Sequence, residues 1–211
     1  MDFLQEKSVS AKDHPLKWEE SSKAENVVRR TLPVLALNEV FVGESLSSRV
    51  SYLEIKFDSD VATKSRNSGL CISTGTGSTS WTFNINKLTH QSVEAILKIA
   101  FEVTKFPLNY KDDRLVEAVT QRFNNDLIFD PELSLMSYTL RDPVSVGTFP
   151  GATERKPRGK ARRIEVKSKC FDACLVLDGS LSYKFNDGTR AIIELYDEDA
   201  LRTVQLYSNE I

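Results

Sequence analysis

Residue types that build metal sites and disulfide frameworks are scarce in this sequence. The chain of 211 residues holds two histidines and three cysteines, which is few for an ordinary zinc site. The cysteines are odd in number, and only Cys170 and Cys174 lie close together, a spacing that favours free thiols over disulfides. We therefore predict free cysteines and no metal held by protein ligands alone.

Long apolar runs and an excess of one charge are also missing. No stretch approaches the roughly 20 apolar residues that span a bilayer. Basic side chains number 28 and acidic ones 30, for a formal net charge of −2. Such a balance provides no long-range field that would attract nucleic acid or an anionic membrane. We predict that neither nucleic acid nor a membrane is a partner.

The first 30 residues differ in character from the rest. They are polar, carry charges of both signs, and show neither the apolar core of a signal peptide nor the Arg-rich, acid-poor pattern of a transit peptide. We predict that residues 1–30 are a tail or the remnant of a missing element. Residues 31–211 are predicted to form one domain, because their number suits a single core.

Short strands with two helices among them are the main pattern after residue 30. Apolar alternation or short apolar runs predict strands at 32–43, 52–57, 69–73, 135–140, 144–148, 164–167, 173–177, 181–185, 191–196 and 203–207. One-sided apolar spacing predicts a helix over 93–101, capped by Thr89, and a second helix after Asp112. The run 186–188, Asn-Asp-Gly, predicts a tight hairpin. The sequence therefore favours a mainly β, sandwich-like fold with two helices over a parallel βαβ array.

A segment rich in glycine and hydroxyl side chains follows the third predicted strand. It consists of Thr74, Gly75, Thr76, Gly77, Ser78 and Thr79. Small residues allow backbone N–H groups to approach a polar ligand such as a phosphate. The spacing fits neither a Walker A loop nor a dinucleotide fingerprint. On the glycine content alone, an ordinary flexible turn is the favoured interpretation. Trp81 after it offers a stacking surface, although an aromatic next to a turn is more often a core anchor.

Asn38 and Glu39 interrupt an otherwise apolar strand. Consecutive strand residues point to opposite faces, so one can face a core and the other a pocket. An Asn amide can recognise a purine edge, and a carboxylate can accept hydrogen bonds from ribose hydroxyls. A solvated strand edge is the alternative interpretation.

Three segments occur in an order typical of one enzyme family. They are LNEVFVGE at 37–44, LCISTGTGSTSWTFN at 70–84 and LVLDGS at 175–180. Together they resemble the motifs of the ATP-NAD kinase family, particularly its mitochondrial branch, over roughly residues 31–207. The resemblance implies the β-sandwich-like C-terminal domain of the NAD kinase fold. It also implies phosphorylation of NAD to NADP with ATP and Mg²⁺, a homodimer or larger assembly with sites completed across subunits, and a mitochondrial location, with the cytoplasm as alternative.

The resemblance further assigns roles to individual residues. The residues that match the family's NAD-contacting positions are Asn38, Glu39, Thr79, Ser80, Trp81 and Asn84. The family's late DG motif corresponds to Asp178 and Gly179, where a structural turn is as plausible as contact with a ligand.

Departures from the family pattern limit these assignments. Gly75 stands where the family usually has Pro, Trp81 where it has Tyr, and Ser68 where bacterial members often have Asp. The GGDGT motif of the family's N-terminal domain, which carries the catalytic Asp, does not occur in the sequence. We therefore expect no catalytic residue among these 211 residues, and binding of NAD without its phosphorylation.

Two interpretations of such a chain stay open. It is part of an NAD kinase whose other half supplies the catalytic Asp, or a non-catalytic NAD-binding or regulatory isoform that associates with the full-length kinase. The basic stretch at 154–169, ERKPRGKARRIEVKSK, is predicted to be an exposed loop that runs into a strand rather than a site for nucleic acid.

Overall fold

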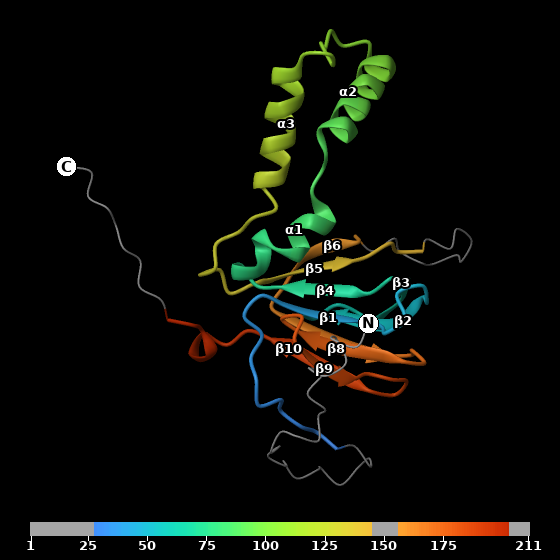
Figure 1. The fold of residues 1–211 in the computed structure, drawn as a ribbon, viewed down its shortest axis with the longest axis vertical. Coiled ribbons are helices and arrows are strands. Elements are labelled where there is room, and N and C mark those ends of the chain that lie inside the picture. The colour runs from blue at the N-terminus through green and yellow to red at the C-terminus, as the bar shows by residue number, and fades with distance from the viewer. Residues whose placement is uncertain (1–27, 145–155, 203–211) are drawn as a thin grey trace, which may run out of the picture.

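Two β-sheets enclose the core in the computed structural model, which describes residues 28–144 and 156–202 (Figure 1). One sheet contains β1 (Glu39–Glu44), β4 (Leu70–Ser73), β5 (Met136–Leu140), β6 (Arg158–Ala161), β8 (Ala173–Leu177) and β9 (Leu181–Lys184). The other contains β2 (Ser51–Phe57), β3 (Thr63–Asn67), β7 (Arg163–Ser168) and β10 (Arg190–Glu194). Their strand orders are β6-β5-β4-β1-β8-β9 and β10-β7-β2-β3, with antiparallel pairing. The prediction of a mainly β, sandwich-like fold is confirmed.

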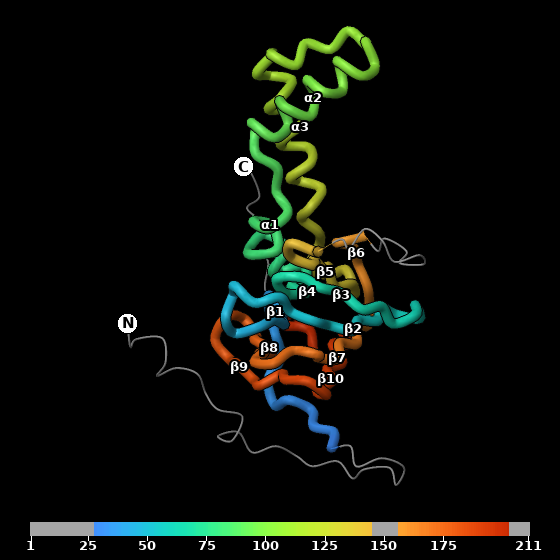
Figure 2. The backbone as a smooth tube through the Cα atoms, turned by 90° about the vertical axis from the view of Figure 1, so that its right-hand side faces the viewer, coloured from blue at the N-terminus to red at the C-terminus, as the bar shows by residue number. Residues whose placement is uncertain are grey.

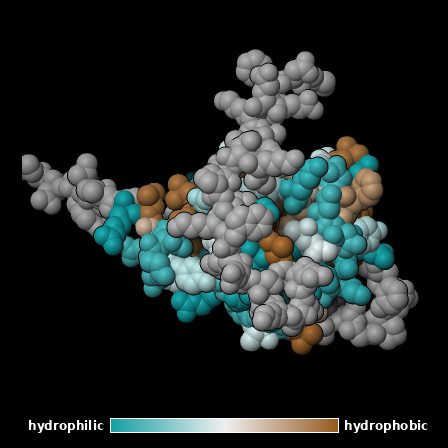
Figure 3. Space-filling view, turned by 90° about the horizontal axis from the view of Figure 1, so that it is seen from below, coloured by the Kyte–Doolittle hydropathy of each residue, from teal (hydrophilic) through white to brown (hydrophobic). Residues whose placement is uncertain are grey.

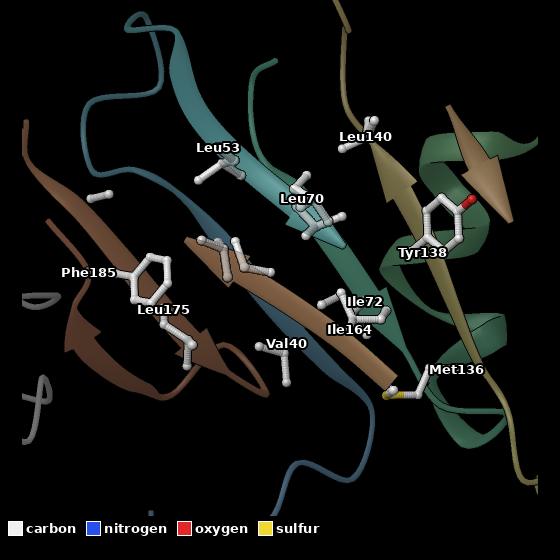
Figure 4. Packing of buried hydrophobic residues seen from close by; sticks show 14 of the residues in the cluster. Val40, Leu53, Leu70, Ile72, Met136, Tyr138, Leu140, Ile164, Leu175 and Phe185 are labelled. Carbon is white, nitrogen blue, oxygen red and sulfur yellow. The ribbon is translucent and has the colours of Figure 1, made fainter. Parts of the chain in front are cut away.

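Alternation along the strands determines which side chains fill the space between the sheets. Val40 of β1 and Leu53 of β2 point inward (Figure 4), and both are buried. Val42, two residues after Val40, is buried as well. Across the two sheets, the rings of Phe57 and Tyr138 stack with centroids 3.8 Å apart. Burial of each such apolar side chain contributes about 1.5–3 kcal/mol to folding. The odd-numbered residues of β1, including Glu39, consequently lie on the outer face of the six-stranded sheet.

Two longer helices form a hairpin that projects from the sheets (Figures 1 and 2). They are α2 (His90–Thr104) and α3 (Asp113–Asn125), preceded by the short α1 (Trp81–Asn86). The Thr89 hydroxyl accepts a hydrogen bond from the Ser92 N–H at 3.2 Å, which confirms the predicted cap. The Asn124 side chain both accepts from the Leu88 N–H and donates to the Leu88 carbonyl, at 2.9 and 3.0 Å. This pair of bonds fixes the base of the hairpin.

Three predicted elements differ from the structure. The strand predicted over 32–43 begins only at Glu39. The turn at 186–188 exists, with the Thr189 N–H donating to the Asn186 carbonyl at 3.0 Å, but it does not make a hairpin. It connects β9 to β10, which belong to different sheets. The basic stretch is not mainly a loop, because most of it forms β6 and β7.

One strand was not predicted, and two predicted strands cannot be compared with the structure. β3, with the polar sequence TKSRN, was not predicted. The strands expected at 144–148 and 203–207 lie almost entirely outside the described residues. No helix of the described ranges is long and apolar enough to cross a membrane. Seen from below, the described surface mixes hydrophilic and hydrophobic residues (Figure 3).

Candidate functional site

A carboxylate from a distant turn holds the backbone at the start of β1. One oxygen of Asp178 accepts from the N–H of Leu37 at 2.7 Å. The other oxygen accepts from the N–H groups of Asn38 and Glu39, at 2.7 and 3.0 Å. The Asp178 N–H in turn donates to the Glu39 carbonyl at 2.9 Å. The carboxylate of the late DG motif therefore acts within the protein, where it sets the position of the Asn38-Glu39 dipeptide.

The turn that presents Asp178 requires an unusual backbone conformation. Asp178 and Gly179 have φ angles of +47° and +67°, and the Ser180 N–H donates to the Leu177 carbonyl at 3.0 Å. Two consecutive positive φ angles are typical of the two-residue hairpin turns for which Asp-Gly is favoured. This turn joins β8 to β9, so the tight hairpin lies here and not at 186–188.

The Gly-rich segment holds the same dipeptide from the other side. Thr74 donates its hydroxyl to the Leu37 carbonyl at 2.6 Å and its N–H to the Asn38 carbonyl at 3.0 Å. A Cβ added to Gly77 would overlap the Asn38 carbonyl oxygen and lie 2.7 Å from the Ser73 hydroxyl oxygen. Gly77 is therefore needed because two backbone segments touch, which is one of the uses of glycine.

The remainder of that segment is equally involved in internal packing. A Cβ on Gly75 would lie 2.5 Å from the Asp130 carbonyl oxygen, in the loop after α3. The hydroxyl of the buried Ser78 accepts from the Phe129 N–H at 3.3 Å. Thr76–Thr79 forms a 3-10 helix. The segment is thus a fixed structural junction, and its direct contact with a phosphate stays a prediction.

Outward-facing residues of the six-stranded sheet line up across its strands. The pairing register places Phe41, Cys71, Thr139 and Arg158 in one row. Arg141 follows Thr139 by two residues and so belongs to the same face. Helix α1 packs on this face, where the Asn86 amide donates to the Thr139 hydroxyl at 2.8 Å. Glu39 and the start of α1 consequently share one side of the sheet.

Trp81 is held over this face by stacking. Its ring centroid lies 4.8 Å from that of Phe41, and the guanidinium carbon of Arg141 lies 5.8 and 5.9 Å from the Trp81 and Phe41 centroids. Such distances are typical of aromatic and cation–π contacts. The Phe41 ring occupies the space that a side chain on Gly69, whose φ is +127°, would need. Trp81 still exposes 38% of its surface, so it can stack on a ligand as well.

The residues predicted to contact NAD face two separate hollows. A wide hollow of 2850 Å³ runs along residues 28–40 and β10 and includes Asn38 and Glu39 in its wall. A smaller one of 680 Å³ lies between α1 and the edge formed by β5 and β6, and Trp81 and Asn84 line it. The other two predicted contacts are exposed: Thr79 ends η1 (Thr76–Thr79), and Ser80 lies between η1 and α1. A single chain thus does not bring the predicted NAD contacts into one pocket.

The Glu39 carboxylate is partly withdrawn from water. Burial raises its pKa above the usual 4.5, and the neighbouring Asp178 carboxylate raises it further. A raised pKa means that the folded protein binds this proton more tightly than the unfolded chain. The stability that Glu39 contributes therefore falls as the pH rises above the pKa of Glu39 in the unfolded chain. Above its pKa in the folded protein, the contribution stays unfavourable.

Replacing Glu39 with Gln should remove this penalty. We expect E39Q to be at least as stable as the wild type near pH 7, and to show a weaker loss of stability as the pH rises above 4.5. Its affinity for NAD should nevertheless fall, a combination typical of binding residues. Urea unfolding across this pH range, together with calorimetric titration of NAD, measures both. A variant that is clearly less stable at neutral pH would contradict the expected sign.

The three cysteines differ strongly in accessibility. Cys71 is fully buried, and burial together with the Glu39 carboxylate raises the pKa of its thiol to about 12. Cys170 is buried as well, whereas Cys174 is partly exposed. Because the thiolate is the reactive form, a native-state thiol reagent should label Cys174 first and Cys71 only after unfolding. Peptide mass spectrometry measures the order, with C174S as control. Labelling of Cys71 at the rate of Cys174 would contradict the structure.

Among residues 28–144 and 156–202, no group of three or more His, Cys, Asp or Glu side chains is placed to hold a metal ion. The family resemblance implies Mg²⁺, but we assign none of the described residues as its ligand.

Sequence comparison shows which proteins this chain resembles. The chain is 45% identical over 177 residues to the human protein named NAD kinase 2, mitochondrial, a match that covers 83% of this chain and 39% of the human protein. Over most of its length the chain is thus similar to part of an NAD kinase. The proteins of the same name from Rattus norvegicus and Xenopus tropicalis are 45% and 40% identical over 175 and 191 residues, covering 83% of this chain and 40% and 44% of their own lengths.

The match concerns only part of those NAD kinases. The chain spans about two fifths of the length of the curated relatives it matches. No family model matches it. Among solved structures, a yeast NADH kinase complexed with NADH aligns with a TM-score of 0.46 and 17% identity, over 84% of this chain and 37% of that one. An Archaeoglobus fulgidus NAD kinase in complex with ATP aligns with a TM-score of 0.45 and 18% identity, over 79% and 52%.

Proposed function

We propose that this chain supplies the NAD-binding half of an NAD kinase, the enzyme that converts NAD to NADP with ATP. The observation that carries the proposal is the fixation of Asn38 and Glu39. The Asp178 carboxylate holds their N–H groups, and Thr74 and Gly77 enclose the Asn38 carbonyl. All three motifs of the family resemblance meet at this dipeptide, within a chain 45% identical to a protein named NAD kinase 2.

The proposed contacts follow from the chemistry of each side chain. The Asn38 amide can both donate to and accept from a purine edge, and Glu39 can accept from ribose hydroxyls. Trp81 offers a partly exposed ring for stacking on a base or nicotinamide. The exposed Thr79, Ser80 and Asn84 supply further hydrogen-bonding groups.

Self-association accounts for the division of these residues between two hollows. In the proposed assembly, the wall that contains Asn38 and Glu39 in one chain meets the wall that contains Trp81 and Asn84 in another. A homodimer is the smallest assembly of this kind. Sedimentation velocity with and without NAD tests it, and a chain that stays monomeric while it binds NAD would contradict a shared site.

Phosphoryl transfer needs more than a bound acceptor. A metal-held polyphosphate and a base for the attacking hydroxyl must be positioned together. The GGDGT motif that supplies the catalytic Asp in the family is not in the sequence, and ATP and Mg²⁺ are assigned to the complete enzyme. The proposed role of these 211 residues is thus to bind and orient NAD. A mitochondrial location is part of the proposal, by similarity to relatives named mitochondrial.

The test combines a binding and an activity measurement on the purified chain. We expect calorimetry to detect NAD binding that N38A weakens by about tenfold or more, the loss of one good polar contact. N109A, in the exposed loop between α2 and α3, is the matched control and should bind like the wild type. With ATP and Mg²⁺ present, no NADP should form. Formation of NADP by the chain free of host kinase would overturn the proposed division of labour, and a chain without affinity for NAD would overturn the binding role.

A non-catalytic isoform that regulates the full-length kinase is the second candidate. It shares the folded domain and the NAD site, so binding does not distinguish the two. Mixing the chain with a full-length family member does: a regulatory isoform changes the activity of the kinase in proportion to the chain added, whereas a half-enzyme without its partner domain leaves it unchanged.

A further inference from the structure

Two arginines line one hollow on the outer face of the six-stranded sheet. Arg158 of β6 is the cross-strand partner of Thr139 on β5, and Arg141 follows Thr139 by two residues. Side chains two residues apart on a strand share a face, and diagonal cross-strand neighbours are within reach of long side chains. Both residues therefore belong to the same face of the sheet, and both line the hollow beside α1.

Neither arginine is neutralised by an ion pair in the described part of the chain. Instead, each guanidinium lies over an aromatic ring. The carbon of Arg141 is 5.8 Å from the Trp81 centroid, and that of Arg158 is 5.1 Å from the Phe123 centroid. The N–H donors of a guanidinium lie in its plane, so cation–π contact at its face leaves donors for a ligand.

Both arginines line the smaller hollow of 680 Å³, together with Trp81, Asn84 and Thr139. The hollow is open to solvent, so a ligand bound there would stay partly exposed. Among the described residues, Asp142 is the one carboxylate that lines the hollow. The two arginines therefore leave one net positive charge there. An anion with several oxygens next to an aromatic group is the ligand that suits two guanidiniums beside a partly exposed tryptophan.

We propose that Arg141 and Arg158 form a subsite for the pyrophosphate group of a nucleotide, whose base or nicotinamide stacks on Trp81. Only the identity of the nucleotide that occupies this subsite rests on the proposed function. Its chemistry is shared by the pyrophosphate of a dinucleotide and the polyphosphate of a nucleoside triphosphate. Neither arginine belongs to the motifs that identify the family, so the subsite adds a part of the site that those motifs do not specify.

Chemical protection of the wild-type chain tests the subsite without any substitution. Phenylglyoxal modifies exposed arginines, and mass spectrometry reports the rate at each one. Saturating inorganic pyrophosphate should slow modification of Arg141 and Arg158 by at least about fivefold, because bound oxygens cover the reactive N–H edge. Arg114, on the exposed surface of α3, is the internal control and should react at an unchanged rate. Equal rates at Arg141 and Arg158 with and without pyrophosphate would overturn the proposal.

Variants then measure the contribution of each arginine. R141Q and R158Q should each weaken calorimetric binding of pyrophosphate by about tenfold, the loss expected for charge-assisted hydrogen bonds, and R114Q should not. Pyrophosphate binding that is unchanged in both variants would contradict the subsite. Should either variant fail to fold, the protection experiment on the wild type decides alone.

The choice of nucleotide separates this inference from the proposed function. If NAD protects both arginines and ATP does not, the subsite receives the dinucleotide, and the reverse result assigns it to the phosphate donor. If pyrophosphate protects them but NAD does not bind at all, the subsite stands and the NAD-binding role fails. If NAD binds and pyrophosphate protects neither arginine, the subsite fails and the NAD-binding role stands.

Discussion

Replacing Asp178 with Asn should destabilise the protein by about 2–3 kcal/mol and weaken NAD binding at least about tenfold. The Asp178 carboxylate accepts three backbone hydrogen bonds through two oxygens. An amide keeps one oxygen and presents an NH₂ group to an N–H donor, which leaves at least one donor unpaired. Asn tolerates the left-handed backbone of this turn, so the substitution tests the carboxylate and not the turn. Urea unfolding and calorimetry measure the two effects.

The chain offers a matched control for this variant. Asp187 also precedes a glycine in a turn, but its carboxylate contacts only an exposed lysine, Lys169, at 3.4 Å. Since exposed ion pairs contribute little, D187N should change stability by less than about 0.5 kcal/mol and leave NAD affinity unchanged. Equal effects of D178N and D187N would show that Asp178 does not anchor the start of β1.

Replacing Gly77 with Ala should have a comparable effect for a steric reason. The added Cβ would overlap the Asn38 carbonyl oxygen, and backbone cannot move aside as the end of a flexible side chain can. Overpacking at such a contact costs about 1–3 kcal/mol. Displacement of Asn38 should also lower the affinity for NAD. Thermal unfolding and NAD titration of G77A measure both consequences.

Gly188 distinguishes this close contact from the general cost of losing a glycine. Its φ is +89°, and a Cβ there would meet no described atom within 4 Å. The only cost of G188A should therefore be the strain of a left-handed alanine, which lowers the free energy of unfolding by about 1–2 kcal/mol. Its affinity for NAD should not change. If G77A bound NAD as tightly as G188A, the Gly-rich segment would not position Asn38.

Local sequence patterns predicted most elements but not their distribution between the two sheets. The runs at 178–179 and 187–188 are both Asp-Gly between apolar segments, and the local signal for a hairpin is the same at each. Only long-range pairing distinguishes them, because β8 and β9 lie in one sheet while β10 pairs with β7 in the other. β3 was missed because its alternation involves polar residues on an edge strand.

Only the local parts of the candidate site could be predicted, because long-range contacts leave no local sequence pattern. Asn38, Glu39 and the Gly-rich segment are contiguous in sequence and carry a family resemblance. The bond from Asp178 to Leu37 joins residues 141 positions apart, so its role as an anchor could not be inferred from spacing. Arg141 and Arg158 come together through the register of β5 and β6, which sequence pattern does not determine.

In the proposed site, Asp178 contributes to NAD binding by positioning Glu39. A double-mutant cycle with D178N and E39Q, read out as NAD affinity by calorimetry, tests it most directly. If Asp178 acts through the dipeptide, each single variant loses about tenfold in affinity and the double variant loses little more, because the two losses are coupled. Losses that multiply to about a hundredfold would mean that the two carboxylates act independently, and would contradict the account.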